Sequence, residues 1–157
     1  MALPLVSIII TCYNDFAYVE AAISSAVEQS YEEKEVIVVD DGSGEETKSL
    51  LRKNEKRINR LIFQENKGLS AARNRGIESS NGDYIIVLDG DDFFESSFCE
   101  KAVRLMQQNL SKALIITCQA RRFNSKGTID VFTPAGGDLE NFLFQNSAVG
   151  NALFIKN

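Results

Sequence analysis

The chain has 157 residues, 44% of them hydrophobic and 25% charged, which is typical of one soluble globular domain. Its net charge of -5 argues against a nucleic-acid surface, because phosphate binding needs a clustered excess of Lys and Arg. Histidine is absent, which excludes Ser-His and Cys-His nucleophile pairs and most zinc sites. Carboxylates, Lys, Tyr and hydroxyl groups are left for any chemistry.

The sequence shows no membrane or secretion signal. No apolar run reaches the ~20 residues of a membrane span, and residues 1–10 lack the basic flank and cleavage site of a signal peptide. We therefore expect a cytoplasmic protein. Cys12, Cys99 and Cys118 are odd in number and widely spaced, so we expect buried free thiols rather than disulfides or a metal site.

Three apolar runs rich in β-branched residues predict strands that are buried on both faces, as in a parallel sheet; they cover residues 5–11, 35–40 and 84–89. Between the first two, apolar residues at helical spacing predict a helix over 15–31, capped by Asn14 or Asp15.

A more polar helix is predicted over residues 44–57, with Ser43 as its capping residue. The later segments continue the alternation of strand and helix, which predicts an α/β sheet with right-handed crossovers. Beyond residue 119 the pattern predicts a hairpin that turns at Lys126-Gly127. The remaining predicted elements are strands over 60–66, 113–119 and 151–155 and helices over 69–82, 96–109 and 138–146.

Three aspartates, Asp89, Asp91 and Asp92, stand at the end of the third buried strand and directly after it. Close carboxylates repel by about 2 to 4 kcal/mol per pair at an effective dielectric of ~20. A shared divalent cation removes this cost, and Asp-x-Asp can hold Mg²⁺ or Mn²⁺ while other coordination positions stay open for phosphate. The alternative is a solvated turn in which an aspartate caps the next helix.

Other strand ends are also polar, and ligands of open parallel sheets bind at this edge. Tyr13 could stack on a nucleobase or merely pack on the core. Asp41 could accept hydrogen bonds from a base or ribose, or form an Asx turn. Arg73 could bind a diphosphate with its guanidinium, or be solvated or paired with Glu78.

Taken together, the segments "TCYN", "VVDDGS", "ENKG", "AARN" and "VLDGDD" resemble the nucleotide-sugar-binding half of family 2 glycosyltransferases. The likeness runs in order from residue 5 to about 110. It implies the Rossmann-like GT-A fold, an α/β fold with a mostly parallel sheet flanked by helices, here with its C-terminal part truncated. We expect one partial domain over 1–157, with nucleotide-sugar binding in 1–110 and the start of an acceptor part in 111–157.

The resemblance also implies roles for single residues. Thr11 and Tyr13 would contact the base and Asp41 would hydrogen-bond a uracil-type ring. Arg73 would lie near the pyrophosphate, with Asn66 and Lys67 as further candidates. Asp89 would reach the ribose or the metal, and Asp91 would be the principal ligand of Mn²⁺ or Mg²⁺.

The implied reaction is inverting transfer from a nucleoside-diphosphate sugar, UDP-sugar favoured, to a saccharide, lipid-linked or protein acceptor. The family places this work in polysaccharide or glycoconjugate synthesis, in the cytoplasm or at the inner membrane face. Members commonly carry proline at the position of Thr11. Their catalytic base follows a strand like 149–157, so we expect it beyond Asn157. Nothing in the spacing of Asp130, Asp138 and Glu140 indicates that role. We therefore expect this chain to transfer sugar weakly or not at all.

Three alternatives stay open. A haloacid-dehalogenase-like phosphatase would use Asp89 as nucleophile and Asp91 as acid/base, but Asp92-Phe93-Phe94 replaces the Gly-Thr-Leu that such enzymes carry. A sugar nucleotidyltransferase would need a glycine-rich loop after the first strand, and "TCYNDF" has no glycine. A non-catalytic nucleotide-binding or receiver-like module would have its acidic pair after the first strand rather than the second.

Overall fold

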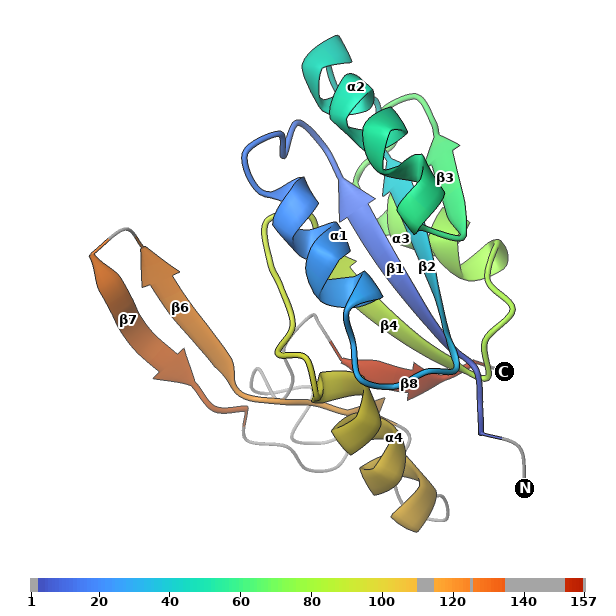
Figure 1. Ribbon diagram of the computed structural model, residues 1–157, viewed down its shortest axis with the longest axis vertical. Coiled ribbons are helices and arrows are strands. Elements are labelled where there is room, and N and C mark those ends of the chain that lie inside the picture. Colours follow the sequence, from blue (N-terminus) through green and yellow to red (C-terminus); the bar gives the residue numbers. More distant parts are fainter. Residues whose placement is uncertain (1–2, 110–114, 125, 135–151, 157) are drawn as a thin grey trace.

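The computed structural model describes residues 3–109, 115–124, 126–134 and 152–156 and shows a central sheet with helices on both faces (Figure 1). Its strands are β1 (Val6–Cys12), β2 (Lys34–Asp40), β3 (Arg60–Phe63), β4 (Tyr84–Asp89), β5 (Ile115–Ile116), β6 (Ala120–Asn124), β7 (Gly127–Phe132) and β8 (Leu153–Ile155). Its helices are α1 (Val19–Val27), α2 (Glu45–Asn54), the 3-10 turn η1 (Glu55–Arg57), α3 (Leu69–Glu78) and α4 (Phe98–Gln108).

The six-stranded sheet has the order β3-β2-β1-β4-β8-β5. β3, β2, β1 and β4 run parallel, which confirms the mostly parallel sheet predicted from the sequence. β8 was predicted as a strand but not placed in the sheet. It lies between β4 and β5 and is antiparallel to both. The last strand described is therefore an inner strand of the sheet.

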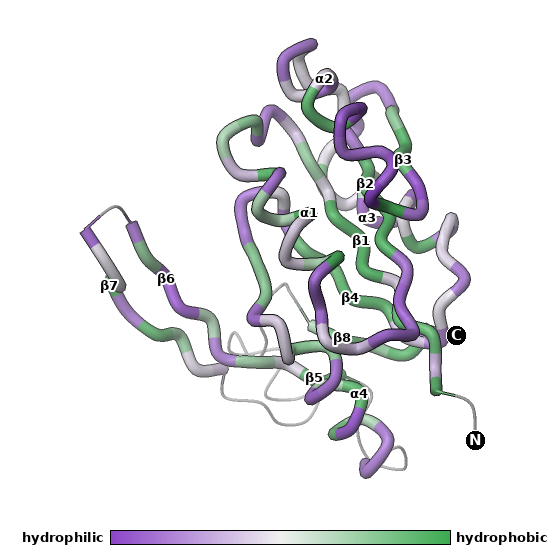
Figure 2. Tube along the Cα trace, viewed as in Figure 1, coloured by the Kyte–Doolittle hydropathy of each residue, from purple (hydrophilic) through white to green (hydrophobic). Residues whose placement is uncertain are grey.

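The two faces of the sheet bury alternate residues of the same strands. Ile8 and Ile10 pack with α1, α2 and α4, while Ile9 faces α3 together with Ile85 and Val87. Since both faces are covered, β1 is buried along its whole length. The hydropathy colours of Figure 2 follow this arrangement, with hydrophobic β1 and β4 in the middle of the fold.

The predicted helix caps are wrong, because the capping side chains bind elsewhere. Tyr18, not Asn14 or Asp15, is the N-cap residue of α1, and Gly44, not Ser43, is that of α2. Asn14 adopts a left-handed conformation (φ 61°), and its Oδ1 accepts a hydrogen bond from the Gly44 N–H (2.8 Å). Ser43 Oγ accepts one from the Asn14 N–H (2.9 Å). These side chains join the loops after β1 and β2.

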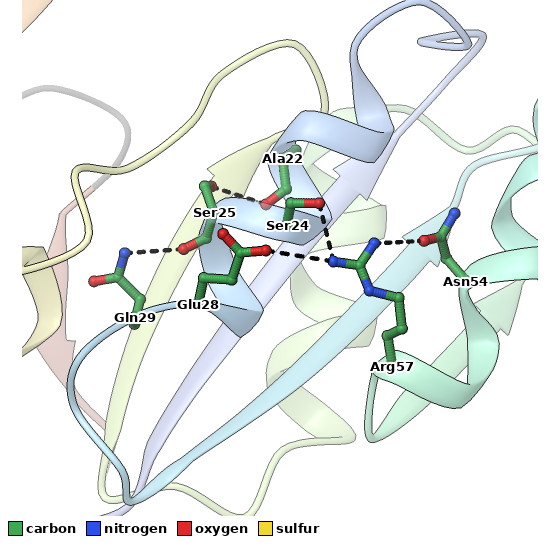
Figure 3. Close-up of polar contacts among 7 residues, drawn as sticks. All are labelled: Ala22, Ser24, Ser25, Glu28, Gln29, Asn54 and Arg57. Carbon is green, nitrogen blue, oxygen red and sulfur yellow. Dashed lines mark hydrogen bonds and ion pairs between the residues drawn. The ribbon is translucent and has the colours of Figure 1, made fainter.

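Arg57 joins η1 to the two preceding helices (Figure 3). Its guanidinium donates to Ser24 Oγ of α1 (3.0 Å) and to Asn54 Oδ1 at the end of α2 (2.9 Å). The carboxylate of Glu28 lies 3.8 Å away. Three partners at one guanidinium fix α2 against α1 on one face of the sheet.

A buried polar network closes the amino-terminal edge of the sheet. Ser7 Oγ donates to Glu35 Oε1 (2.5 Å) and accepts from the Gly82 N–H (2.8 Å). The Asn81 N–H also donates to Glu35 Oε1 (2.6 Å). Burial by itself raises the pKa of Glu35, but these hydrogen bonds outweigh it and hold the pKa below its ordinary value.

β6 and β7 form a separate antiparallel hairpin that projects from the body of the protein (Figure 1). The prediction of a hairpin here is confirmed, and Gly127 at its turn has φ 122°, a conformation that favours glycine. The predicted helix over 138–146 lies outside the described residues.

Candidate functional site

A cavity of about 480 Å³ lies at the carboxyl ends of β1, β2 and β4. The parallel register brings Thr11 beside Asp89 and Cys12 beside Asp40, so the loops after three strands meet there. The residues that line the cavity come from four parts of the chain and are Thr11, Cys12, Tyr13, Asp15, Asp41, Asn66, Gly68, Leu69, Ala72, Asp89, Gly90 and Asp91. This is the edge at which open α/β sheets bind ligands.

Most predicted site residues line this cavity, namely Thr11, Tyr13, Asp41, Asn66, Asp89 and Asp91. Tyr13 is 51% exposed, so its ring is available to a flat ligand. Arg73 and Lys67 are not part of the wall. Arg73 nevertheless contacts the wall through Asp89, and Lys67 contacts it through Asp41.

Asp41 holds the loop that follows β3. Its Oδ1 accepts from Gln64 Nε2 (2.7 Å) and the Lys67 N–H (2.8 Å), and its Oδ2 accepts from the Gly68 N–H (2.8 Å). Burial raises the pKa of Asp41, yet the three hydrogen bonds outweigh it and leave the pKa lowered. Asp41 is therefore a buried anion with most of its acceptor capacity already used.

Asp89 is neutralised in part by Arg73, whose Nη2 lies 2.6 Å from Asp89 Oδ1. Arg73 is thus paired with Asp89 rather than with Glu78, as the alternative interpretation had it. The side chains of Arg73 and Asp89 are 28% and 32% exposed, so the pair faces both protein and solvent. Arg73 Nε is buried and has no hydrogen-bond partner.

Asp15 is a fourth carboxylate in the cavity wall, beside Asp41, Asp89 and Asp91, although its place in the sequence suggested only a helix cap. Its Oδ2 accepts from the Tyr13 N–H (3.0 Å) and lies against Gly90, where an added Cβ would come within 2.5 Å of it. The pKa of Asp15 is raised, first by burial and further by Asp91 and Asp89, while the Tyr13 N–H opposes the shift. The glycine of the "DGDD" segment was the available signal, because it permits this approach.

Two further buried polar atoms at this edge lack a partner. Thr11 is 4% exposed and its Oγ1 makes no hydrogen bond, and the same holds for Oδ1 of the fully buried Asp40. Buried polar groups are usually satisfied, so unpaired ones need an explanation. A ligand that donates or accepts hydrogen bonds in the cavity would provide it for Thr11.

The segment that follows the acidic loop, which is residues 89–92, is anchored to α1 and to the residues just after that helix. Ser25 Oγ accepts from the Phe94 N–H (3.2 Å), and Gln29 Nε2 donates to the Glu95 carbonyl (2.9 Å). Gln29 Oε1 accepts from the Cys99 N–H in the first turn of α4 (2.9 Å). Figure 3 shows Ser25 on α1 and Gln29 just beyond the end of that helix. Nothing in the sequence singles out Gln29, since a glutamine inside the helix predicted over 15–31 looks like a surface residue.

The three cysteines are free, as predicted. Cys12 and Cys99 are buried, whereas Cys118 is only partly buried, so the predicted burial is wrong for Cys118. Burial raises the pKa of Cys12 and that of Cys99 to about 12, so both are neutral thiols at physiological pH. Cys12 therefore lines the cavity as an apolar group and is not a nucleophile.

The site suits a hard divalent cation that shares its coordination with a ligand. Within the described residues, no three His, Cys, Asp or Glu side chains are grouped so as to hold a metal by themselves. Asp89 and Asp91 line the cavity together and supply hard oxygen ligands. Mg²⁺ is commonly held by one or two carboxylates, with water and substrate phosphate completing the shell. The residues present fit that arrangement.

A comparison with protein families shows to which family the chain belongs. The family model described as "Glycosyl transferase family 2" matches residues 7–148. The chain belongs to this family. The resemblance read from the sequence is confirmed, and the phosphatase, nucleotidyltransferase and receiver-like interpretations are set aside.

A curated relative, an uncharacterized glycosyltransferase from Haemophilus influenzae, is 39% identical over 112 residues. The match covers 69% of this chain and 45% of that protein. This family 2 chain spans less than half the length of the curated relatives it matches first.

Solved structures confirm the GT-A fold. TarS of S. aureus, crystallised as residues 1–349 with UDP-GlcNAc, has a TM-score of 0.69 at 23% identity and matches 78% of this chain and 36% of TarS. A mannosyltransferase of Pyrobaculum calidifontis, in complex with GDP-Man and Mn²⁺, has a TM-score of 0.70 at 20% identity. The match covers 99% of this chain and 45% of the mannosyltransferase.

Of the three carboxylates considered as a catalytic base, Asp138 and Glu140 lie outside the described residues. Asp130 pairs with Arg122 across the β6–β7 hairpin, with Arg122 Nε 2.7 Å from Asp130 Oδ1. The hydrogen bonds from Arg122 lower the pKa of Asp130, which makes it a weak base.

No helix among the described residues is long and apolar enough to cross a membrane.

Proposed function

We propose that this chain binds a nucleoside-diphosphate sugar, UDP-sugar favoured, together with Mn²⁺ or Mg²⁺, as the donor part of an inverting glycosyltransferase. The observation that carries the proposal is the cavity at the strand ends, where the carboxylates of Asp89 and Asp91 meet the buried, unpaired Thr11 Oγ1. Two carboxylates in one wall repel a diphosphate unless a cation stands between them.

The expected roles follow from position. Tyr13 is exposed at the mouth and suits stacking on the base, with Thr11 beside it. Asp41 organises the loop that carries Asn66 and Lys67, and so acts on the base partly through that loop. Arg73 has a spare buried donor in its Nε and lies next to Asp89.

A bound cation would supply positive charge for the departing diphosphate. Arg73 adds charge of the same sign from the protein. Asp41 and Gln64 keep the loop after β3 closed on the cavity. The described carboxylate Asp130 is tied to Arg122, so we do not assign it as the base that deprotonates the acceptor.

Calorimetric titration with UDP, with and without Mn²⁺, tests the proposal. Mn²⁺ should strengthen UDP binding at least about tenfold, because it relieves the repulsion between carboxylates and diphosphate. Asp91→Asn should remove that gain. Glu65→Gln, which alters an exposed carboxylate outside the cavity wall, is the matched control and should keep it. UDP binding that ignores both Mn²⁺ and Asp91→Asn would show the site assignment to be wrong.

The wider expectations stay predictions. They are a donor part over 1–110 with the start of an acceptor part over 111–157, and a saccharide, lipid-linked or protein acceptor in polysaccharide or glycoconjugate synthesis. A location in the cytoplasm or at the inner membrane face is tested by fractionating cells that express the protein. Complete turnover by these 157 residues on a defined acceptor would contradict the expected lack of a base.

A further inference from the structure

A second cavity, of about 520 Å³, lies on the other side of the acidic loop. One wall is the segment 92–98, and the other is formed by residues 118–123 and Thr128 of the hairpin region. Two contacts hold these walls together. Arg121 pairs with Glu95 (2.8 Å), and the rings of Phe93 and Phe123 have centroids 5.4 Å apart with their planes tilted by 59°.

The walls combine aromatic faces with polar groups. Phe93 is 49% exposed and Phe123 is 56% exposed, although both line a cavity. Phe94 and Phe98 stack on one another in the same wall, with ring centroids 4.4 Å apart. Lys101 and Gln119 add hydrogen-bonding groups to the lining. Half-exposed phenyl rings in a polar setting mark a binding surface rather than a core.

The position of this cavity relates it to the donor site. Gly90 and Asp91 line the donor cavity, and the next two residues, Asp92 and Phe93, line the second one. Glycosyl transfer requires the acceptor hydroxyl and the donor carbon to meet at about 3 to 3.5 Å. A molecule in the second cavity is separated from the donor by one stretch of loop backbone.

We propose that this second cavity binds the acceptor, and that the acceptor group it holds is a saccharide stacked on Phe93 and Phe123. The proposal rests on the proposed donor function. A pyranose ring has C–H groups on its faces and hydroxyls around its edge. Its C–H faces suit the negative faces of phenyl rings, and its hydroxyls can exchange hydrogen bonds with Lys101 and Gln119.

An alkyl chain suits the same walls less well. It would offer no hydrogen bond to the Lys101 ammonium, and covering a charged group without giving it a partner is costly. The Arg121–Glu95 pair would lose water in the same way. A saccharide satisfies both kinds of surface.

The test uses the 157-residue chain, labelled and applied to a printed array of oligosaccharides of glucose, galactose, N-acetylhexosamines and glucuronic acid, with a dodecyl chain and an unglycosylated peptide as further spots. Phe123→Ala and Phe93→Ala should each weaken saccharide binding about tenfold, the effect of losing the burial of one aromatic side chain. Ile129→Ala is the matched control, because Ile129 is 61% exposed on the same hairpin and does not line the cavity.

Calorimetry with UDP and Mn²⁺ on the same variants separates this proposal from the donor site. All three variants should bind UDP like the unaltered chain. Binding to saccharide spots that both phenylalanine variants lose and Ile129→Ala keeps would support the proposal. Intact UDP binding without saccharide binding would overturn it, and so would binding to the dodecyl or peptide spots alone. If the unaltered chain did not bind UDP, the result would instead contradict the proposed function.

Discussion

The two ends of the same parallel sheet differ in whether their buried polar groups have hydrogen-bond partners. At the amino-terminal edge, Ser7, Glu35, Asn81 and Gly82 satisfy one another, and Glu35 accepts from both Ser7 and Asn81. At the carboxyl edge, Thr11 Oγ1, Asp40 Oδ1 and Arg73 Nε are buried without partners. The carboxylates of Asp15, Asp89 and Asp91 share one wall there.

The presence or absence of a hydrogen-bond partner separates polar groups that stabilise the fold from polar groups that are free to bind a ligand. Ser7 and Thr11 stand on the same strand, and both are buried. Only the Ser7 hydroxyl has hydrogen-bond partners within the protein, whereas the Thr11 hydroxyl has none. A buried polar side chain is therefore no guide to function until its partners are known.

The largest expected effect is on Glu35. Glu35→Ala removes the acceptor of the Ser7 hydroxyl and the Asn81 N–H and should lower the free energy of unfolding by about 3 kcal/mol. Urea denaturation measures this loss. Glu33→Ala, at an exposed neighbour, should change it by less than about 0.5 kcal/mol. UDP affinity at a temperature where both variants are folded should stay the same, and a drop would show that the two ends are coupled.

The second prediction compares the two hydroxyls on β1. Ser7→Ala should cost about 2 kcal/mol, because it leaves Glu35 and the Gly82 N–H without their partner. Thr11→Val should change stability by no more than about 0.5 kcal/mol, since Oγ1 has no partner to lose. UDP affinity should show the reverse order. Equal loss of stability in both variants would contradict the contrast drawn between the two edges.

A smaller effect concerns acid stability. The pKa of Glu35 is lowered in the folded protein, so its contribution to stability is complete above its ordinary value of 4.5 and is lost as the pH falls through the folded value. Unfolding followed by circular dichroism should show a decline below about pH 4.5. Glu35→Gln should make this decline shallower, and an unchanged pH profile would mean that Glu35 does not carry it.

The smallest effect should come from Asp15, and it has the opposite sign. Its pKa is raised by burial and by Asp91 and Asp89, so the ionised carboxylate destabilises the fold above its folded pKa. Asp15→Asn keeps an acceptor for the Tyr13 N–H and should raise stability at neutral pH by less than about 1 kcal/mol, since solvent screens this partly exposed group. Thermal unfolding at low and high salt measures it; a loss of stability would show that the hydrogen bond needs the anion.

The sequence predicted the parallel strands and most of the cavity wall because both depend on local patterns. Continuous β-branched runs at 5–11, 35–40 and 84–89 indicate buried strands, and parallel strands bring their carboxyl ends together. The residues at the carboxyl ends of those strands, such as Thr11 and Asp89, were therefore predicted to lie close together. Tertiary detail was not needed.

The parts that were missed depend on contacts between segments far apart in the sequence. Asn14 and Ser43 look like helix caps by local rules, yet they bind one another's loops. Asp15 meets Gly90 only after β1 and β4 have paired. Gln29 serves three backbone groups, and two of them lie in the segment 95–99. No periodicity in the sequence reports such pairings.

The position of β8 has a consequence for synthesis on the ribosome. β4 carries Asp89, but its second neighbour is β8, whose Phe154 packs with Ile85 and Val87. Until residue 155 has left the exit tunnel, residues 84–86 of β4 lack this neighbour and present an open edge, and such edges recruit other chains. A nascent chain stalled before residue 152 should therefore need a chaperone more than one released after it.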